Sequence, residues 1–153
     1  MAATKLVLGE IGFKGIRITE NRRLPRGGVG GEILAMIGIV GALRGHFVIR
    51  FRDQDALSFV EHLSGHLGME GEDADDVRYR KAAIGEMSNQ LGGRAMAALA
   101  DSGIDCMVTP PTIITGTSVA SALPESDDRC IFSAAGRFGR FHCILAIKNS
   151  KAL

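Results

Sequence analysis

One long helical pattern, over residues 74–100, constrains the fold of this chain more than any other feature. Its apolar side chains recur at intervals of three and four, which is the spacing of one face of an α-helix. The segments before and after it have strand patterns, so the helix is expected to lie on a sheet. The positions of its predicted core face are Ile84, Met87, Leu91, Ala95 and Ala98.

A second face of the same pattern carries Glu86, Asn89 and Gly93. Residues three or four positions apart share one face of a helix. Glycine inside a helix is less favourable than alanine by about 1 kcal/mol, yet residues 92 and 93 are both glycine. A carboxylate, a carboxamide and bare backbone on one face can hold a water molecule and admit another protein. This face favours hydrolysis at a partner's surface over hydrolysis in a deep pocket, although the pair alone also fits an ordinary solvated helix.

The segments before the long helix predict a hairpin and a shorter helix. Residues 32–40 and 42–52 are rich in strand-forming side chains, and they predict an antiparallel hairpin that turns near residues 41–45. A helix capped by Asp53 follows. Its apolar positions and its end are Leu57, Val60, Leu63, Leu67 and Gly68.

The segments after the long helix predict strands. Residues 104–108 and 112–115 are predicted as short strands, separated by a Thr-Pro-Pro sequence at 109–111. Beyond a Ser/Gly loop, residues 129–134 and 141–147 predict a final hairpin. Together the patterns predict an α/β fold of the α+β type, with long helices packed on an antiparallel β-sheet.

Size and composition exclude several classes of protein. At 153 residues the chain is expected to form one domain, residues 1–153, with only weak strand signals over residues 1–31. A formal net charge of +1 and 5% aromatic residues give no sign of a nucleic-acid partner. The longest apolar run, residues 33–43, is too short to cross a bilayer. No apolar signal segment precedes the cysteines, so reduced thiols in a cytoplasmic protein are expected, buried as small residues rather than catalytic; they are Cys106, Cys130 and Cys143.

Three local patterns have competing interpretations. The glycine-rich residues 27–31 lack the Lys-Ser/Thr ending of a phosphate-binding loop and favour a flexible turn. His62 and His66 have metal-ligand spacing, but no third ligand is evident, so a solvated helix face is favoured. The acidic residues 70–76 fit the start of a helix better than a metal site.

The helix motif and the Thr-Pro-Pro break together resemble the CheX branch of the CheC/CheX/FliY chemotaxis phosphatases. The resemblance covers residues 38–116, and the last hairpin in outline. A single Glu-x-x-Asn helix resembles CheX rather than CheC, which usually carries two. The matching residues are Ala83-Ile84-Gly85-Glu86 with Asn89 and Gly93, followed by residues 108–116.

This resemblance implies a reaction and a set of roles. The protein would remove the phosphoryl group from the aspartyl phosphate of a CheY-like response regulator. Asn89 would orient the attacking water, and Glu86 would pair with a lysine of the receiver domain. Gly93 would let the partner's backbone approach, with a role in helix packing as the alternative. The Mg²⁺ ion would belong to the partner, so the chain is expected to have no cofactor or metal of its own.

The resemblance also implies a CheC/CheX-like domain that forms a homodimer through sheet edges. The alternative function is a non-catalytic CheY-binding adaptor related to flagellar rotor proteins, and the presence of both Glu86 and Asn89 favours the enzyme. Two departures from the family are visible. Ala82 stands where the family often has Ser or Asp, so this chain has no polar side chain at that position to support Glu86. Residues 1–26 do not predict the amphipathic helix with which the family tends to begin.

Overall fold

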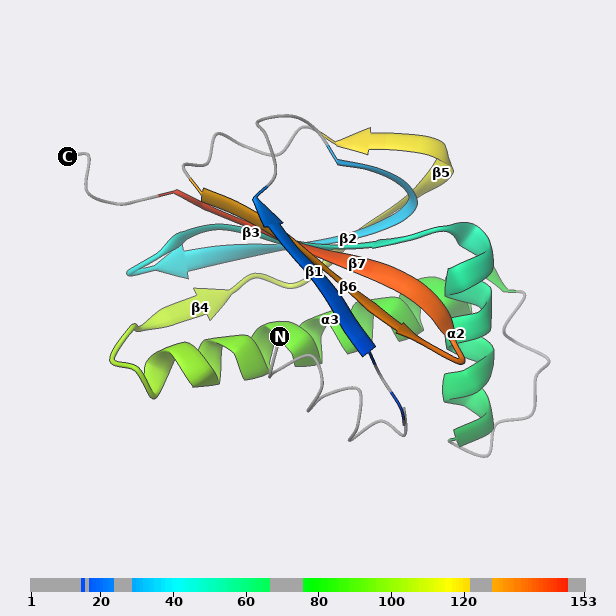
Figure 1. Cartoon of the computed structure of the whole chain (residues 1–153), viewed down its shortest axis with the longest axis horizontal. Helices are drawn as coiled ribbons and strands as arrows, with labels where there is room; N and C mark the ends of the chain where they lie inside the picture. The colour runs from blue at the N-terminus through cyan, green and yellow to red at the C-terminus, as the bar shows by residue number, and fades with distance from the viewer. Residues whose placement is uncertain (1–14, 16, 24–28, 67–75, 122–127, 149–153) are drawn as a thin grey trace.

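The computed structural model describes residues 15, 17–23, 29–66, 76–121 and 128–148 of the chain. Figure 1 shows the helix α3 along one face of the sheet and the helix α2 at one end of it. In chain order the described elements are β1 (Arg17–Arg23), β2 (Val29–Gly41), β3 (Arg44–Phe51), α2 (Asp53–His66), α3 (Val77–Ala100), β4 (Cys106–Val108), β5 (Thr112–Ser121), β6 (Asp128–Gly136) and β7 (Gly139–Lys148).

The strands form one seven-stranded sheet in which every pairing is antiparallel. The order is β1-β6-β7-β3-β2-β4, and β5 also pairs with β2. The two predicted hairpins, β2–β3 and β6–β7, are confirmed. Strand β2 is long enough for β4 and β5 to share one of its edges, β4 along its last residues and β5 along its earlier ones.

The Thr-Pro-Pro sequence interrupts this shared edge. Thr109 is bound to Gly38 of β2 twice, because its N–H donates to the Gly38 carbonyl and its Oγ1 accepts from the Gly38 N–H, both at 2.9 Å. Pro110 and Pro111 follow and have no N–H to give to a ladder. Pairing with β2 resumes at Thr112. The predicted break is therefore an edge strand in two pieces, held in register by one threonine.

The main core lies between the helices and the sheet face that they cover. At the end of this core near α2, phenylalanine rings pack in a cluster, with the centroids of Phe51 and Phe141 5.0 Å apart and those of Phe59 and Phe138 5.8 Å apart. The predicted fold class is confirmed, although of the two described helices only α3, with 24 residues, is long, and α2 has 14.

Some predicted boundaries are wrong. The glycine-rich segment is not a turn as far as it is described, because residues 29–31 are the start of β2 and pair with β5. The predicted Ser/Gly loop is too long, since β5 continues to Ser121. In both places the ladder between two strands outweighs the weak strand propensity of glycine and serine. Leu67, Gly68 and the acidic residues 70–75 lie outside the described residues.

No helix in the described part of the chain is both long and apolar enough to span a membrane. The three cysteines are free thiols; Cys106 and Cys143 are buried and Cys130 is half-buried. Burial raises the pKa of the Cys143 thiol far above its usual range, so this thiol stays protonated and is a poor nucleophile. The expectation of small, buried cysteines is confirmed for these two.

Candidate active site

Helix α3 carries the predicted site, and its two ends are set by local chemistry. Asp76 precedes the first turn in an extended conformation, and its Oδ1 accepts from the N–H of Arg78 at 2.8 Å. The helix therefore begins at Val77, later than the predicted residue 74. It ends at Ala100, and Gly103 follows with a φ of 78°, a conformation that glycine adopts at little cost.

The core face of α3 differs in part from the predicted one. Ile84, Met87 and Leu91 are buried as predicted, but Ala95 is half-buried and Ala98 is exposed. Ser88 and Gly92 take their places in the interface. The buried Ser88 hydroxyl donates to the carbonyl of Ile84 at 2.6 Å, so this polar group is satisfied within the helix.

Glu86, Asn89 and Gly93 are all exposed, and none of them is among the buried residues of α3. The prediction that they share one solvent-facing side of the helix is confirmed. None of the three lines the apolar cavity under the second half of α3 or the cavity beside its first turn, whose lining includes charged side chains. The carboxylate and the carboxamide therefore lie on an open helix surface, where another protein can reach both.

The two adjacent glycines of α3 have different surroundings. A Cβ atom at Gly92 would lie 3.3 Å from Ile37 Cδ1 and 3.5 Å from Val108 Cγ1, so Gly92 allows the helix to approach the sheet closely. A Cβ atom at Gly93 would meet nothing within 4 Å. The alternative in which Gly93 serves helix packing is therefore wrong, and the packing role belongs to Gly92.

The interrupted sheet edge runs alongside the site. Val108 and Ile113 stand on either side of the Thr-Pro-Pro sequence, and each lies close to one glycine of α3. Val108 is next to Gly92, and a Cβ at Gly85 would lie 3.9 Å from Ile113. Since Asn89 falls between these two glycines along the helix, the break in the edge strand flanks the exposed face that carries Asn89.

A contact missed by the sequence analysis holds the Glu86 carboxylate. The side-chain Nε2 of Gln90 donates to Glu86 Oε1 at 3.0 Å, one helical turn further along. Ala82, one turn before Glu86, has no polar side chain to offer. The spacing of four residues between Glu86 and Gln90 was the available signal, because such pairs are neighbours on a helix surface.

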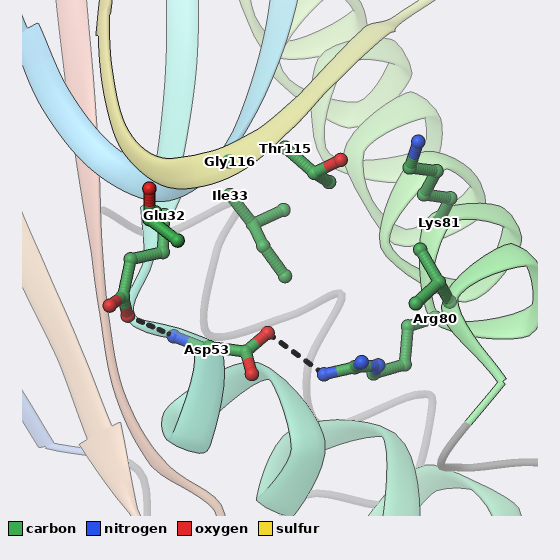
Figure 2. A pocket seen from close by; sticks show the side chains of 9 residues that line it. Glu32, Ile33, Asp53, Arg80, Lys81, Thr115 and Gly116 are labelled. Carbon is green, nitrogen blue, oxygen red and sulfur yellow. Dashed lines mark hydrogen bonds and ion pairs between the residues drawn. The ribbon is translucent and has the colours of Figure 1, made fainter.

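A second missed contact joins the first turn of α3 to the start of α2. Figure 2 shows Asp53 between Glu32 and Arg80 at a cavity of about 360 Å³. Arg80 Nη1 binds Asp53 Oδ1 at 2.9 Å, and the N–H of Asp53 donates to Glu32 Oε2 at 2.6 Å. These contacts tie the first turns of α3 and α2 to strand β2. The Arg80 side chain is only 13% exposed while that of Asp53 is 62% exposed, so the pair serves mainly to orient α3 on the sheet.

Metal-ligating side chains do not gather in the described part of the chain, where no three His, Cys, Asp or Glu residues lie close enough to hold an ion. His62 is exposed on α2. The exposed polar side chains between residues 86 and 90 of α3 are the carboxylate of Glu86 and the carboxamides of Asn89 and Gln90. Such groups can position a water molecule and bind a cationic side chain, and they do not by themselves supply a nucleophile.

Solved structures share this arrangement of a sheet with one long helix. The chain superposes on the crystal structure of a chemotaxis protein CheX from Desulfovibrio desulfuricans with a TM-score of 0.82 and 23% identity, over 96% of this chain and 95% of that one. It also superposes on the CheX–CheY–BeF₃–Mg²⁺ complex from Borrelia burgdorferi with a TM-score of 0.72 and 19% identity, over 95% and 93% of the two chains. At these identities the likeness defines the fold, that of the CheC/CheX-like proteins.

Comparison at the level of sequence identifies the family. The family model described as chemotaxis phosphatase CheX matches residues 33–134, which is more than half of the chain, and the chain belongs to this family. A curated relative, the CheY-P phosphatase CheX of Thermotoga maritima, is 32% identical over 85 residues. The match covers 56% of this chain and 52% of the relative, so the chain spans about half the length of the curated relative that it matches.

Proposed function

We propose that this protein is a phosphatase that hydrolyses the aspartyl phosphate of a CheY-like response regulator. The observation that carries the proposal is the placement of Glu86 and Asn89 together on an exposed helix face, in a chain of the CheX family. The Thermotoga relative is named a CheY-P phosphatase, and the Borrelia structure holds CheX with CheY. Both names support a phosphorylated receiver domain as the substrate.

The chemistry fits the groups that this face presents. Water attacks the phosphorus, the bond from phosphorus to the aspartyl oxygen breaks, and inorganic phosphate and a free aspartate result. Phosphoryl transfer depends on positioning and charge stabilisation more than on covalent catalysis. The neutral Asn89 carboxamide accepts a hydrogen bond from the water without repelling the anionic phosphate. Glu86 pairs with a receiver lysine, and the Mg²⁺ ion is supplied by the receiver.

Decay of phosphorylated receiver domains from the same organism, with and without this protein, tests the proposal directly. Acceleration at substoichiometric amounts supports an enzyme. Binding of a receiver without acceleration supports instead the adaptor related to flagellar rotor proteins. We further propose a cytoplasmic location, because receiver domains with aspartyl phosphates are the intended substrates.

Gly93 gives a prediction in which stability and activity change in opposite directions. Gly93→Ala is expected to stabilise the free protein by about 1 kcal/mol, because alanine is the better helix former and its methyl group meets nothing. The same methyl group would hold the partner away from the helix, and a displacement of about 1 Å can cost ~10²-fold in rate. Urea denaturation and receiver decay measure the two effects.

Gly65→Ala is the matched control, since a Cβ at Gly65 of α2 would also meet nothing within 4 Å. It should keep full activity while its stability stays level or rises. A Gly93→Ala protein that gains stability and still dephosphorylates the receiver at the wild-type rate would remove Gly93 from the docking surface.

We also propose that the protein forms a homodimer through sheet edges. Strand β1 and the β4–β5 edge are the outer strands of the sheet, and unpaired strand edges can pair with a second chain. Light scattering at micromolar concentration should give twice the chain mass, with one Glu86/Asn89 site per subunit. A strictly monomeric species would contradict this proposal without affecting the phosphatase one.

A further inference from the structure

The Glu86 carboxylate is exposed but has a hydrogen-bond partner before any other protein arrives. Gln90 Nε2 donates to its Oε1 at 3.0 Å. Among the described residues Glu86 forms no other hydrogen bond, so Oε2 is left available to an incoming cation. A carboxylate can accept several hydrogen bonds at once, and the contact with Gln90 is therefore compatible with a second one.

An exposed glutamate without such a partner samples many rotamers. Fixing a long side chain on binding costs conformational entropy, and a side chain that is already held loses less. Ala82 provides no support from the preceding turn. Gln90 supplies it from the following turn, on the same strip of helix surface, and its own side chain is exposed. The carboxylate is thus turned toward the second half of α3, where Asn89 and Gly93 lie.

We propose that Gln90 is a positioning residue, which orients the Glu86 carboxylate so that Oε2 meets the receiver lysine while Oε1 stays bound to Gln90. The inference rests on the proposed function. In this chain the Gln90 carboxamide, one turn after Glu86, supports the glutamate. A Ser or Asp in place of Ala82, one turn before it, would otherwise give that support. Its effect should lie in docking rather than in the chemical step, because Gln90 acts only through Glu86.

The competing explanation is an ordinary surface pair that slightly favours the helix. Pairs of this kind four residues apart stabilise isolated helices weakly, and they would influence the free protein alone. The two explanations differ in receiver affinity. When the carboxylate is buried against the receiver, loss of a donor to a charged acceptor has a larger effect than it has in water.

The variants Gln90→Met and Gln90→Lys test the proposal, with Gln54→Met as the matched control on the exposed start of α2. Methionine keeps the length of the side chain and removes the donor. We expect Gln90→Met to weaken binding of a beryllofluoride-loaded receiver about three- to tenfold. The single-turnover rate at saturating protein should stay within about twofold of wild type. Gln90→Lys should bind more weakly still at low salt, because its ammonium group competes with the receiver lysine for Glu86.

A double-mutant cycle and an NMR measurement complete the test. With Glu86→Ala already present, Gln90→Met should have no further effect on affinity. In the free protein, Glu86→Ala should shift the side-chain amide resonances of Gln90 and leave those of Gln54 in place.

The outcomes separate the inference from the function on which it rests. Unmoved Gln90 amide resonances would show that the contact does not form and would overturn the proposal. If the Gln90 amide resonances do shift, but Gln90→Met binds the receiver as tightly as Gln54→Met does, the contact is only a surface pair and the proposal is overturned. If neither Glu86→Ala nor Asn89→Ala changes receiver decay, the proposed function is wrong and the positioning role falls with it, whatever the resonances do.

Discussion

Asn89→Ala is expected to abolish the accelerated decay of a phosphorylated receiver while the protein stays folded. Removing one positioned polar group at a transition state typically lowers the rate by ~10²–10³. The fold should survive because Asn89 is exposed and has no part in the core of α3. The measurement is single-turnover decay of the receiver phosphate, together with the midpoint of urea denaturation.

Gln54→Ala is the control, since it removes an exposed carboxamide from the other described helix. It should leave receiver decay unchanged. If Asn89→Ala accelerates receiver decay nearly as much as the wild-type protein does, Asn89 does not orient the attacking water. If the wild-type protein and Asn89→Ala both bind the receiver, and the wild-type protein never accelerates decay of the receiver phosphate, the adaptor function is the better description.

Glu86→Lys is expected to weaken receiver binding more than Glu86→Ala does. Removal of a charge-assisted hydrogen bond at an interface typically costs about 1.5–3 kcal/mol, or roughly 10- to 150-fold in affinity. The lysine variant adds repulsion between two cations, and like charges facing each other at an interface cost several kcal/mol more. Affinity for a beryllofluoride-loaded receiver at two salt concentrations measures both effects.

Glu61→Lys makes the same change of charge at an exposed position of α2. It controls for the altered net charge and should bind normally. Substitutions at the two site residues should also lower different quantities. Those at Glu86 should lower receiver affinity, because Glu86 contributes on docking, and those at Asn89 should mainly lower the rate of hydrolysis, because Asn89 contributes in the transition state. A Glu86→Lys protein that binds and turns over like wild type would show that another face of the protein docks the receiver.

Periodicity was sufficient to predict the elements that form the main layers. The spacing of Ile84, Met87 and Leu91 identified the buried side of α3, and both hairpins followed from strand-like runs around glycine. The predictions were wrong at positions where secondary structure or burial depends on contacts with residues distant in the sequence. Gly30 and Gly31 are in a strand only because β5 lies beside them. On α3, Ser88 and Gly92 are buried whereas Ala95 is half-buried and Ala98 is exposed, and the Ser88 hydroxyl is satisfied by a hydrogen bond within the helix.

The site was predictable as far as one helix could define it. Glu86, Asn89 and Gly93 share a face by helical geometry, which requires no knowledge of the rest of the chain. The Arg80–Asp53 pair joins residues 27 positions apart on two helices and had no pattern to reveal it. The packing alternative for Gly93 could be resolved only by the distances around it, since Gly92 and Gly93 are indistinguishable as letters in a sequence.

The interrupted edge beside β2 bears on how safely this chain folds. Most of the longest apolar run of the sequence, residues 33–43, lies in β2, and a strand of that kind with a free edge is a template for aggregation. Here β3 covers one edge, and β4 and β5 cover most of the other. The residues that complete this cover come more than sixty positions after β2 in the chain. During synthesis this second edge of β2 therefore stays unpaired until β4, Thr109 and β5 have been made.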